Sequence, residues 1–101
     1  MFPLARFRIS DPSMEPGLRA GDYVVVNRWA YRSKRPAVGD VVVLRHPREP
    51  ALHIVKRVSA LHGPGKVFLV GDNAVSSEDS RVFGPVSQDL IVGRVWLRLK
   101  D

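Results

Sequence analysis

The sequence lacks cysteine altogether, which excludes a disulfide framework and a thiolate metal site. It also lacks a long hydrophobic run. The longest runs, at residues 23–26 and 41–44, are far shorter than the ~20 residues that cross a bilayer. The first ten residues, MFPLARFRIS, contain no apolar stretch of signal-peptide length. We therefore expect a soluble, cytoplasmic protein, with any membrane contact being peripheral.

Size and charge narrow the choice further. The 101 residues, 45% of them hydrophobic, predict one domain over residues 1–101 whose core forms without disulfides or metal ions. The 16 lysines and arginines against 10 aspartates and glutamates give a net charge of +6. This excess suits nucleic acid, an anionic membrane or an acidic protein as partner, and charge alone does not choose among them.

Hydrophobic periodicity predicts an all-β fold. Short runs rich in β-branched residues are bounded by Gly-Asp, Pro and Asn turn signals, whereas no helix-period pattern is long enough to indicate a helix. The predicted strands cover residues 23–28, 40–45, 51–61, 66–71 and 90–99. The polar segment at 72–88 is long for a loop in a small domain, and such a length favours a functional role.

One predicted strand contains an anomaly. In LHIVKRVSAL, alternation puts Lys56 on the same face as Leu52, Ile54 and Val58. Lys56 is then either an edge residue that extends its ammonium group to water or a desolvated amine. Burial lowers the pKa of a lysine, and a lysine that is neutral near pH 7 can act as a general base.

Ser13 is the candidate nucleophile for such a base. It lies in ISDPSMEPGLRAGD, where Pro12 and Pro16 exclude a central strand and Gly17 marks a turn. We therefore expect Ser13 to be displayed on a rigid bend. The alternative is that its hydroxyl only bonds local backbone, as serines in turns commonly do.

Several motifs together resemble the signal peptidase I family of Ser-Lys proteases. They are PSMEP followed by Leu and Gly-Asp, the strands GDVVVL and VKRV, and finally GDN, SxDSRxFGPV and IVGRV. They occur in the family's order and span nearly the whole chain. The resemblance implies a small, mostly antiparallel coiled β-sheet or partial barrel, a serine endopeptidase activity on protein precursors, and no cofactor.

The resemblance also implies roles for individual residues. Ser13 matches the nucleophile that forms the acyl-enzyme, and Lys56 matches the general base. Ser77 matches the serine that orients the lysine; a loop-capping role is the alternative. Asp79 and Arg81 match a supporting ion pair.

Further matches lie beside the nucleophile. Asp72 and Asn73 are expected to fix a turn, and Met14 to pack near the pocket for small residues. The family uses the backbone N–H of the nucleophile as an oxyanion donor, often with a small or hydroxyl residue two positions earlier. That position is Asp11 here. Either Asp11 points away and Ser10 assists, or the oxyanion hole is weaker than in the family, because an ionised carboxylate cannot donate.

The short chain, with PSMEP, LRHP and VKRV, most resembles the nickel-type superoxide dismutase maturation proteases. These remove a propeptide from a cytoplasmic apo-enzyme, so the expected partner is the pro-form of that dismutase. We expect no metal on this chain, because His46, His53 and His62 are not at ligand spacing. Each histidine is interpreted as a surface or structural residue.

Two alternative functions remain. The first is a general signal peptidase that processes exported precursors at the membrane and contacts lipid through Phe2, Leu4, Phe7 and Trp29. The second is a basic β-barrel that binds RNA or DNA, with Trp29, Tyr31 and nearby cations as a platform. The precursor, its cleavage sequence and the oligomeric state stay open.

Overall fold

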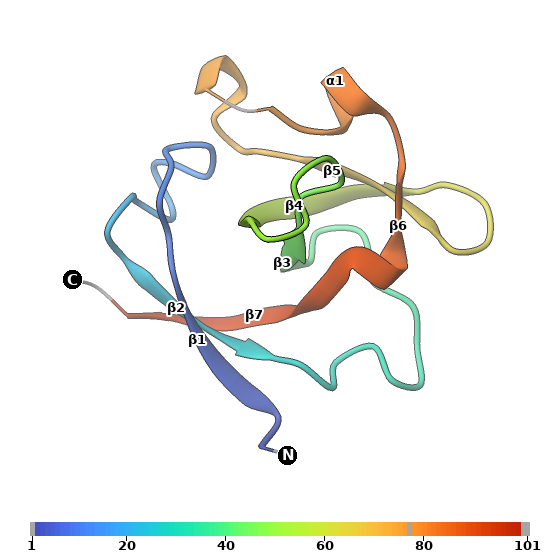
Figure 1. Ribbon diagram of the computed structural model, residues 1–101, viewed down its shortest axis with the longest axis horizontal. Coiled ribbons are helices and arrows are strands. Elements are labelled where there is room, and N and C mark those ends of the chain that lie inside the picture. The colour runs from blue at the N-terminus through green and yellow to red at the C-terminus, as the bar shows by residue number, and fades with distance from the viewer. Residues whose placement is uncertain (1, 77, 100–101) are drawn as a thin grey trace.

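A computed structural model describes residues 2–76 and 78–99 of the chain. It contains a single antiparallel sheet with the strand order β1-β2-β7-β3-β4-β5-β6 (Figure 1). The strands are β1 (Leu4–Arg8), β2 (Tyr23–Asn27), β3 (Val41–Arg45), β4 (His53–Leu61), β5 (Lys66–Val70), β6 (Val86–Ser87) and β7 (Ile91–Leu99). Three short helical turns, η1 (Ala74–Ser76), α1 (Ser80–Phe83) and η2 (Gln88–Leu90), lie in or beside the segment that follows β5. The expected all-β fold is confirmed.

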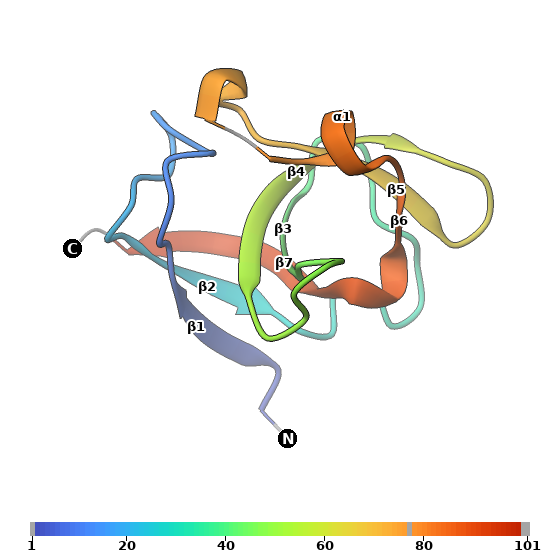
Figure 2. The same cartoon turned by 45° about the horizontal axis from the view of Figure 1, so that its top comes forward.

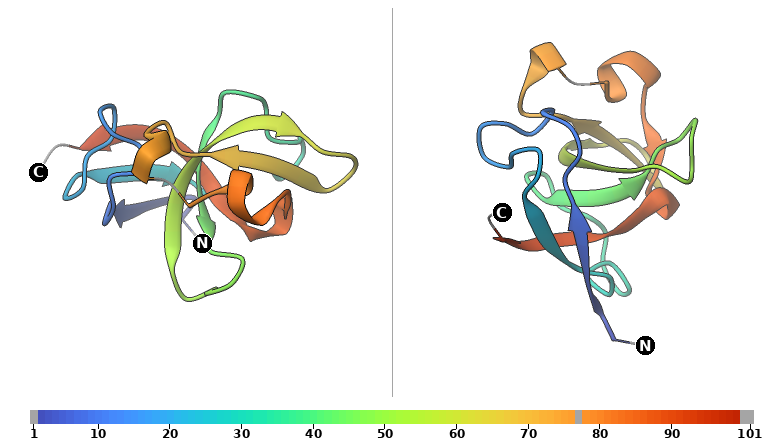
Figure 3. Two further views of the ribbon diagram at one scale, coloured as in Figure 1. Left: turned by 90° about the horizontal axis from the view of Figure 1, so that it is seen from above. Right: turned by 60° about the vertical axis from the view of Figure 1, so that its left-hand side comes forward.

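The sheet is strongly curled. The strand register shifts at Val25/Val26 in β2, at Val43/Leu44 in β3 and between Val58 and Ala60 in β4, and such irregularities increase local twist. Figures 2 and 3 show the curled sheet. The paired strands β7 and β3 lie in the middle of the strand order and connect its two ends. The curl brings the edge strand β1 close to the start of β4, where the rings of Phe7 and His53 lie 5.1 Å apart.

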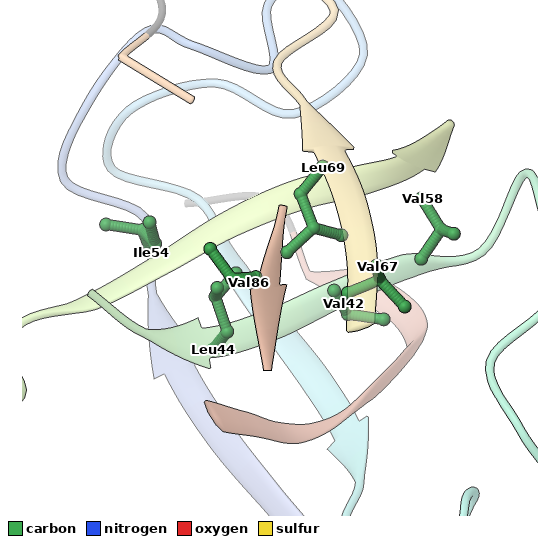
Figure 4. Packing of buried hydrophobic residues seen from close by; sticks show 7 residues of the cluster. All are labelled: Val42, Leu44, Ile54, Val58, Val67, Leu69 and Val86. Carbon is green, nitrogen blue, oxygen red and sulfur yellow. The ribbon is translucent and has the colours of Figure 1, made fainter. Parts of the chain in front are cut away.

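Each face of the curled sheet has its own hydrophobic core. The larger cluster, drawn in Figure 4, consists of Val42, Leu44, Ile54, Val58, Val67, Leu69 and Val86. The second consists of Ile9, Val24, Val26 and Val43, with Phe7 and Val55 packed against it. Neighbouring residues of β3 and β4 thus enter opposite cores, as alternation predicts.

The five predicted strands are all present, with small differences at their ends. The fourth begins at His53 rather than at residue 51, so Leu52 is 41% exposed and does not share the buried face of β4. Sequence analysis missed β1 and β6. β1 is an edge strand with Arg6 and Arg8 exposed, and β6 has two residues, so neither has a clear hydrophobic pattern. No helix in the described part of the chain is long and apolar enough to cross a membrane.

Candidate active site

The segment that carries Ser13 is a turn held by main-chain hydrogen bonds. The N–H of Glu15 donates to the carbonyl of Pro12 at 3.0 Å. Asn73, which follows β5, donates its backbone N–H to the Ser13 carbonyl at 2.7 Å and its side-chain amide to the Pro12 carbonyl at 3.1 Å. The expected rigid bend is therefore present, and its bonds to Asn73 are a contact that the sequence analysis did not predict. Ser13 itself is 2% exposed, so it is more enclosed than a displayed turn residue.

Met14 joins the same two segments. Its side chain is 1% exposed, and the N–H of Asp72 points to its sulfur atom at 3.4 Å. Asp72 in turn forms a two-point ion pair with the guanidinium group of Arg57 in β4, with N–O distances of 2.9 and 2.8 Å. The hydrogen bonds from Arg57 lower the pKa of Asp72. The turn at residues 71–73 is thus fixed on both β4 and the Ser13 segment.

Lys56 lies on the buried face of β4. Its side chain is 2% exposed, between Ile54 at 6% and Val58 at 0%. The interpretation as a desolvated amine is confirmed, and the interpretation as a strand-edge lysine reaching water is wrong. Alternation along β4 placed Lys56 on this face but left both interpretations open, and the observed burial decides between them.

Burial and nearby carboxylates shift the pKa of Lys56 in opposite directions. Burial is the largest influence and lowers the pKa of its amine, and the positive charge of Arg81 lowers it further. The carboxylates of Asp11, Asp79 and Glu78 act in the opposite direction, and the net effect is a lowered pKa. A lysine in this state supplies a larger fraction of neutral amine near neutral pH than an exposed lysine does.

Asp11 turns its side chain back toward Ser13. The backbone N–H of Ser13 donates to Oδ1 of Asp11 at 3.0 Å. The alternative in which Asp11 points away is therefore wrong for this structure. Pro12 has no N–H and a fixed φ, so the next available donor after Asp11 is the N–H of Ser13.

A small cavity lies between the segment that carries Ser13 and strand β4, which carries Lys56. One wall contains Arg8, Ser10, Asp11, Ser13 and Met14, and the other contains residues 53–55, which lead directly to Lys56. Its volume is about 10 Å³, room for one water molecule or a group of methyl size. All three residues expected at an oxyanion or substrate pocket, Ser10, Asp11 and Met14, line this cavity.

Both walls carry strand edges that can accept a further strand. β1 is the first strand in the sheet order. Within the described residues, β5 pairs with β4 only from Arg57 onward, so residues 53–56 have β3 on one side alone. Extended peptides bind by adding a strand to such edges.

Asp79 and Arg81 form the predicted ion pair. The Asp79 carboxylate is 0% exposed and accepts from Arg81 Nη2 at 2.5 Å and from Arg81 Nε at 3.0 Å. It also accepts from the N–H of Gly71 at 2.7 Å and caps α1 through the N–H of Arg81. The pair therefore ties the end of β5 to α1. Ser77, predicted to orient Lys56, lies outside the described residues, so that role stays a prediction.

Sequence analysis did not find the contact between His46 and Glu78. The N–H of Arg48 donates to Nδ1 of His46, so Nε2 carries the hydrogen and donates to Glu78 at 3.2 Å. The His46 ring also packs edge-on against Phe83, with centroids 5.8 Å apart. His46 thus has a structural role, as expected, and it holds the residue next to Asp79. The described residues contain no group of three ligands suited to a metal ion.

The nucleic-acid interpretation gains little from the structure. Tyr31 packs against the larger core and donates its hydroxyl to Asp40 at 2.7 Å. The guanidinium group of Arg32 lies 4.2 Å above the ring of Trp29 and covers one of its faces. One face of the Trp29 ring and the hydroxyl group of Tyr31 are therefore already engaged within the protein.

Comparison with known proteins identifies the family. The chain matches the family described as "Signal peptidase, peptidase S26" over residues 1–65 and 63–100. The chain belongs to this family. The family expected from the motifs, a family of serine peptidases, is confirmed, and the curled antiparallel sheet is consistent with its core.

Individual relatives support the same assignment. The chain is 34% identical to mitochondrial ATP-independent inner membrane protease subunit 1a of Arabidopsis thaliana over 90% of its own length. It is 35% and 34% identical to mitochondrial inner membrane protease subunit 1 of Xenopus tropicalis and Homo sapiens, in each case over 89% of its length. It spans 65% to 67% of the length of these relatives. Their names concern inner membrane proteases and do not mention superoxide dismutase.

Proposed function

We propose that this chain is a serine endopeptidase that cleaves protein precursors, with Ser13 as the nucleophile and Lys56 as the general base. The observation that carries the proposal is the burial of Lys56, at 2% exposure, on the wall that leads to the Ser13 cavity. Burying a lysine among core residues is costly unless its charge is paired or lost. The lowered pKa of Lys56 favours loss of the charge, and that loss produces the base that a serine nucleophile requires.

The reaction follows from these two side chains. The neutral amine of Lys56 takes the proton from Ser13 Oγ while Oγ attacks the scissile carbonyl carbon and the carbonyl π electrons move to oxygen. The tetrahedral intermediate then expels the amine of the leaving segment, which receives the proton from Lys56, and an ester to Ser13 remains. Lys56 next takes a proton from water while the water oxygen attacks the ester carbonyl. The second tetrahedral intermediate releases the acid, and Lys56 returns the proton to Ser13 Oγ and becomes a neutral amine again.

The oxyanion requires a donor where negative charge develops. The N–H of Ser13 suits this role once the Asp11 carboxylate has moved away from it, and Ser10 Oγ is a second candidate. Removal of one such donor lowers the rate by about 10²–10³. The supporting parts are Asp79 with Arg81, which fix α1, and Ser77, which we propose to orient the Lys56 amine.

Substrate binding uses the two unpaired strand edges. An extended segment of the precursor adds as a strand between residues 8–11 and residues 53–56, with its scissile carbonyl at Ser13. The cavity of about 10 Å³ between these walls supports a preference for small side chains next to the scissile bond.

The physiological precursor is the finer part of the proposal. The motifs PSMEP, LRHP and VKRV support removal of the propeptide of a nickel-type superoxide dismutase in the cytoplasm. The relatives' names support the alternative, in which precursors are processed at a membrane surface. Incubation of the purified protein with each precursor, followed by mass spectrometry of the new N-terminus, separates the two. Cell fractionation tests the location independently.

The catalytic assignment is tested by substitution. Ser13→Ala and Lys56→Ala should each abolish precursor cleavage while the circular dichroism spectrum stays that of the wild type. Ser59→Ala and Lys66→Ala are matched controls, because both residues are exposed on β4 and β5, away from the cavity. Normal cleavage by either Ser13→Ala or Lys56→Ala contradicts the assignment.

A further inference from the structure

A second pocket adjoins the peptide groove, which is the space between residues 8–11 and residues 53–56 where the substrate strand is proposed to bind. It has a volume of about 470 Å³ and is lined by Phe7, Arg28, Arg45, His53, Ile91 and Val92. These residues come from β1, β3, β4 and β7 and from the residue after β2, so the curl of the sheet is what assembles the pocket. His53 also lines the Ser13 cavity, which makes the two spaces neighbours. The sequence motifs assign no role to this pocket.

The pocket has a strongly cationic lining. Arg45 and His53 are directly opposite each other in the β3–β4 register, so both side chains point to the same face of the sheet. Among the described residues, the exposed guanidinium group of Arg45 has no hydrogen bond or ion pair. Arg45 is therefore a charged donor group available to a ligand.

Arg28 adds a positioned charge. Its backbone N–H donates to the Pro3 carbonyl at 2.7 Å, and its Nη2 donates to the Phe2 carbonyl. Its Nε atom is buried and has no hydrogen-bond partner in the part of the chain that the structure describes. The guanidinium group is thus held at the pocket by residue 2, and its positive charge attracts an anionic ligand there.

The lining contains no carboxylate. Each of two neighbouring pockets contains one carboxylate: Asp89 lines the pocket that shares Arg28, and Asp11 lines the Ser13 cavity, which shares His53. Arg8, on the wall of the Ser13 cavity, extends the positive charge toward the groove. The apolar part of the lining, Phe7 with Ile91 and Val92, excludes water from part of the space and strengthens electrostatic attraction there.

We propose that this pocket is a substrate subsite that binds an aspartate or glutamate side chain four to six residues from the scissile bond. The inference rests on the proposed peptidase function. A strand that follows β4 from Lys56 back to His53 covers three residues, or about 10 Å at ~3.3 Å per residue, and the pocket begins at His53. A carboxylate there accepts charge-assisted hydrogen bonds from Arg45 and Arg28. The enzyme thus selects precursors that carry an acidic residue at a fixed distance from the cleavage site.

The test measures peptide binding and cleavage separately. A peptide with small residues around the scissile bond carries Asp, Asn or Lys at one position, scanned from three to seven residues away on each side. Binding to the Ser13→Ala variant is followed by fluorescence anisotropy, and kcat/KM is measured with the wild type. At one position, the Asp peptide should bind about tenfold more tightly than the Asn peptide, and the Lys peptide more weakly than both.

Substitution of the pocket supplies the control. Arg45→Gln should remove most of the preference for Asp, and Arg45→Glu should reverse the order so that the Lys peptide binds best. Arg48→Gln is the matched control, because Arg48 is exposed just after β3 and does not line the pocket. It should leave the preference unchanged.

The two levels of the proposal fail in different ways. Equal affinity for Asp, Asn and Lys at every scanned position, or an unchanged order of affinities in Arg45→Glu, overturns the subsite even where the peptides are cleaved. Selective binding of the Asp peptide with equal cleavage by the wild type and Ser13→Ala overturns the catalytic assignment while the subsite stands.

Discussion

The backbone N–H of Ser13 is bonded to the carboxylate of Asp11, with a distance of 3.0 Å between N and Oδ1. The same N–H is the donor that acyl transfer at Ser13 would use for the oxyanion. An ionised carboxylate on this donor both occupies it and repels developing negative charge. For the Ser13 N–H to serve the oxyanion, the Asp11 side chain must rotate away, and we expect this step to slow the proposed reaction.

Replacement of Asp11 should accelerate cleavage. In Asp11→Ala the Ser13 N–H is free, so we expect kcat to rise about tenfold, a fraction of the full effect of one oxyanion donor. Asp11 also raises the pKa of Lys56, against the larger effect of burial. Its removal should therefore move the acidic limb of the pH–kcat profile to lower pH, because more Lys56 is neutral at a given pH.

Asp11→Asn separates the two effects. The amide oxygen still accepts from Ser13, so kcat at the pH plateau should stay near that of the wild type, while the loss of negative charge still shifts the acidic limb. A tenfold loss of kcat in Asp11→Ala, at unchanged Tm, would mean that the carboxylate assists the reaction, and would contradict this account.

Lys56 should make the protein more stable as pH rises. Burial lowers its folded-state pKa below the ordinary value of 10.5. Between the lowered pKa and 10.5, the unfolded chain binds more protons than the folded protein, so the free energy of unfolding increases with pH in that window. Below it, Lys56 is charged in both states and the burial penalty is fully present.

Lys56→Met removes the titrating amine. We expect the free energy of unfolding of the variant, relative to that of the wild type, to fall as pH rises through the window between the lowered pKa and 10.5, because only the wild type gains stability there. Urea unfolding at several pH values measures it. Lys66→Met, at an exposed position of β5, should show no such trend. A stability difference between Lys56→Met and the wild type that does not change with pH contradicts a desolvated Lys56.

Gly93 should be irreplaceable in β7. A Cβ atom at this position would lie 2.4 Å from the Asn27 carbonyl oxygen and 2.6 Å from Val26 Cγ1, so β2 would have to move. We expect Gly93→Ala to lower the free energy of unfolding by about 2–3 kcal/mol. At Gly17 the nearest atom would be 3.8 Å away, and Gly17→Ala should stay within about 0.5 kcal/mol. Equal Tm values for the two variants would contradict the close packing at Gly93.

Features set by local sequence were predictable. The strands near residues 23–28 and 40–45 are short apolar runs between turn signals, and the face of β4 on which Lys56 lies follows from alternation along one strand. The contact of Asp79 with Arg81 joins residues two positions apart in a recognised motif. In each case the pattern and the contact lie in the same stretch of chain.

Features that depend on the curl of the sheet were not predictable. The pocket around Arg45 and His53 needs residues from four strands and from the end of β2, and its existence depends on how far β1 bends toward β4. The bond from Ser13 to Asp11 depends on one side-chain rotamer, which composition and spacing do not determine. The His46–Glu78 contact joins residues 32 positions apart.

The buried Asp79 carboxylate should be essential for stability. Asp79→Ala would leave the N–H of Gly71 and the guanidinium group of Arg81 without their acceptor and remove the cap of α1. We expect a loss of about 3 kcal/mol, measured as a fall in the urea midpoint. Asp89→Ala, at an exposed carboxylate, should cost less than about 1 kcal/mol. A similar small loss in Asp79→Ala would show that α1 does not depend on this group.

The ion pair between Arg57 and Asp72 should matter more for activity than for stability. Both side chains are partly exposed, at 41% and 31%, so the pair contributes less than about 1 kcal/mol to folding. The same Asp72 belongs to the turn whose Asn73 holds the Ser13 carbonyl at 2.7 Å. Loosening that turn should misplace Ser13 relative to Lys56, and small displacements of reacting groups reduce rates strongly.

Arg57→Gln should therefore lower kcat about tenfold, with KM changed less than threefold and Tm lowered by a few degrees at most. Arg57 lowers the pKa of Asp72, so this stabilisation is present at neutral pH and is lost as pH falls through the lowered pKa. Arg35→Gln is the matched control, since Arg35 also bonds backbone carbonyls between loops, those of Gly63 and Lys66, but has no contact with the Ser13 segment. A wild-type kcat in Arg57→Gln would mean that Asn73 holds Ser13 without help from the ion pair.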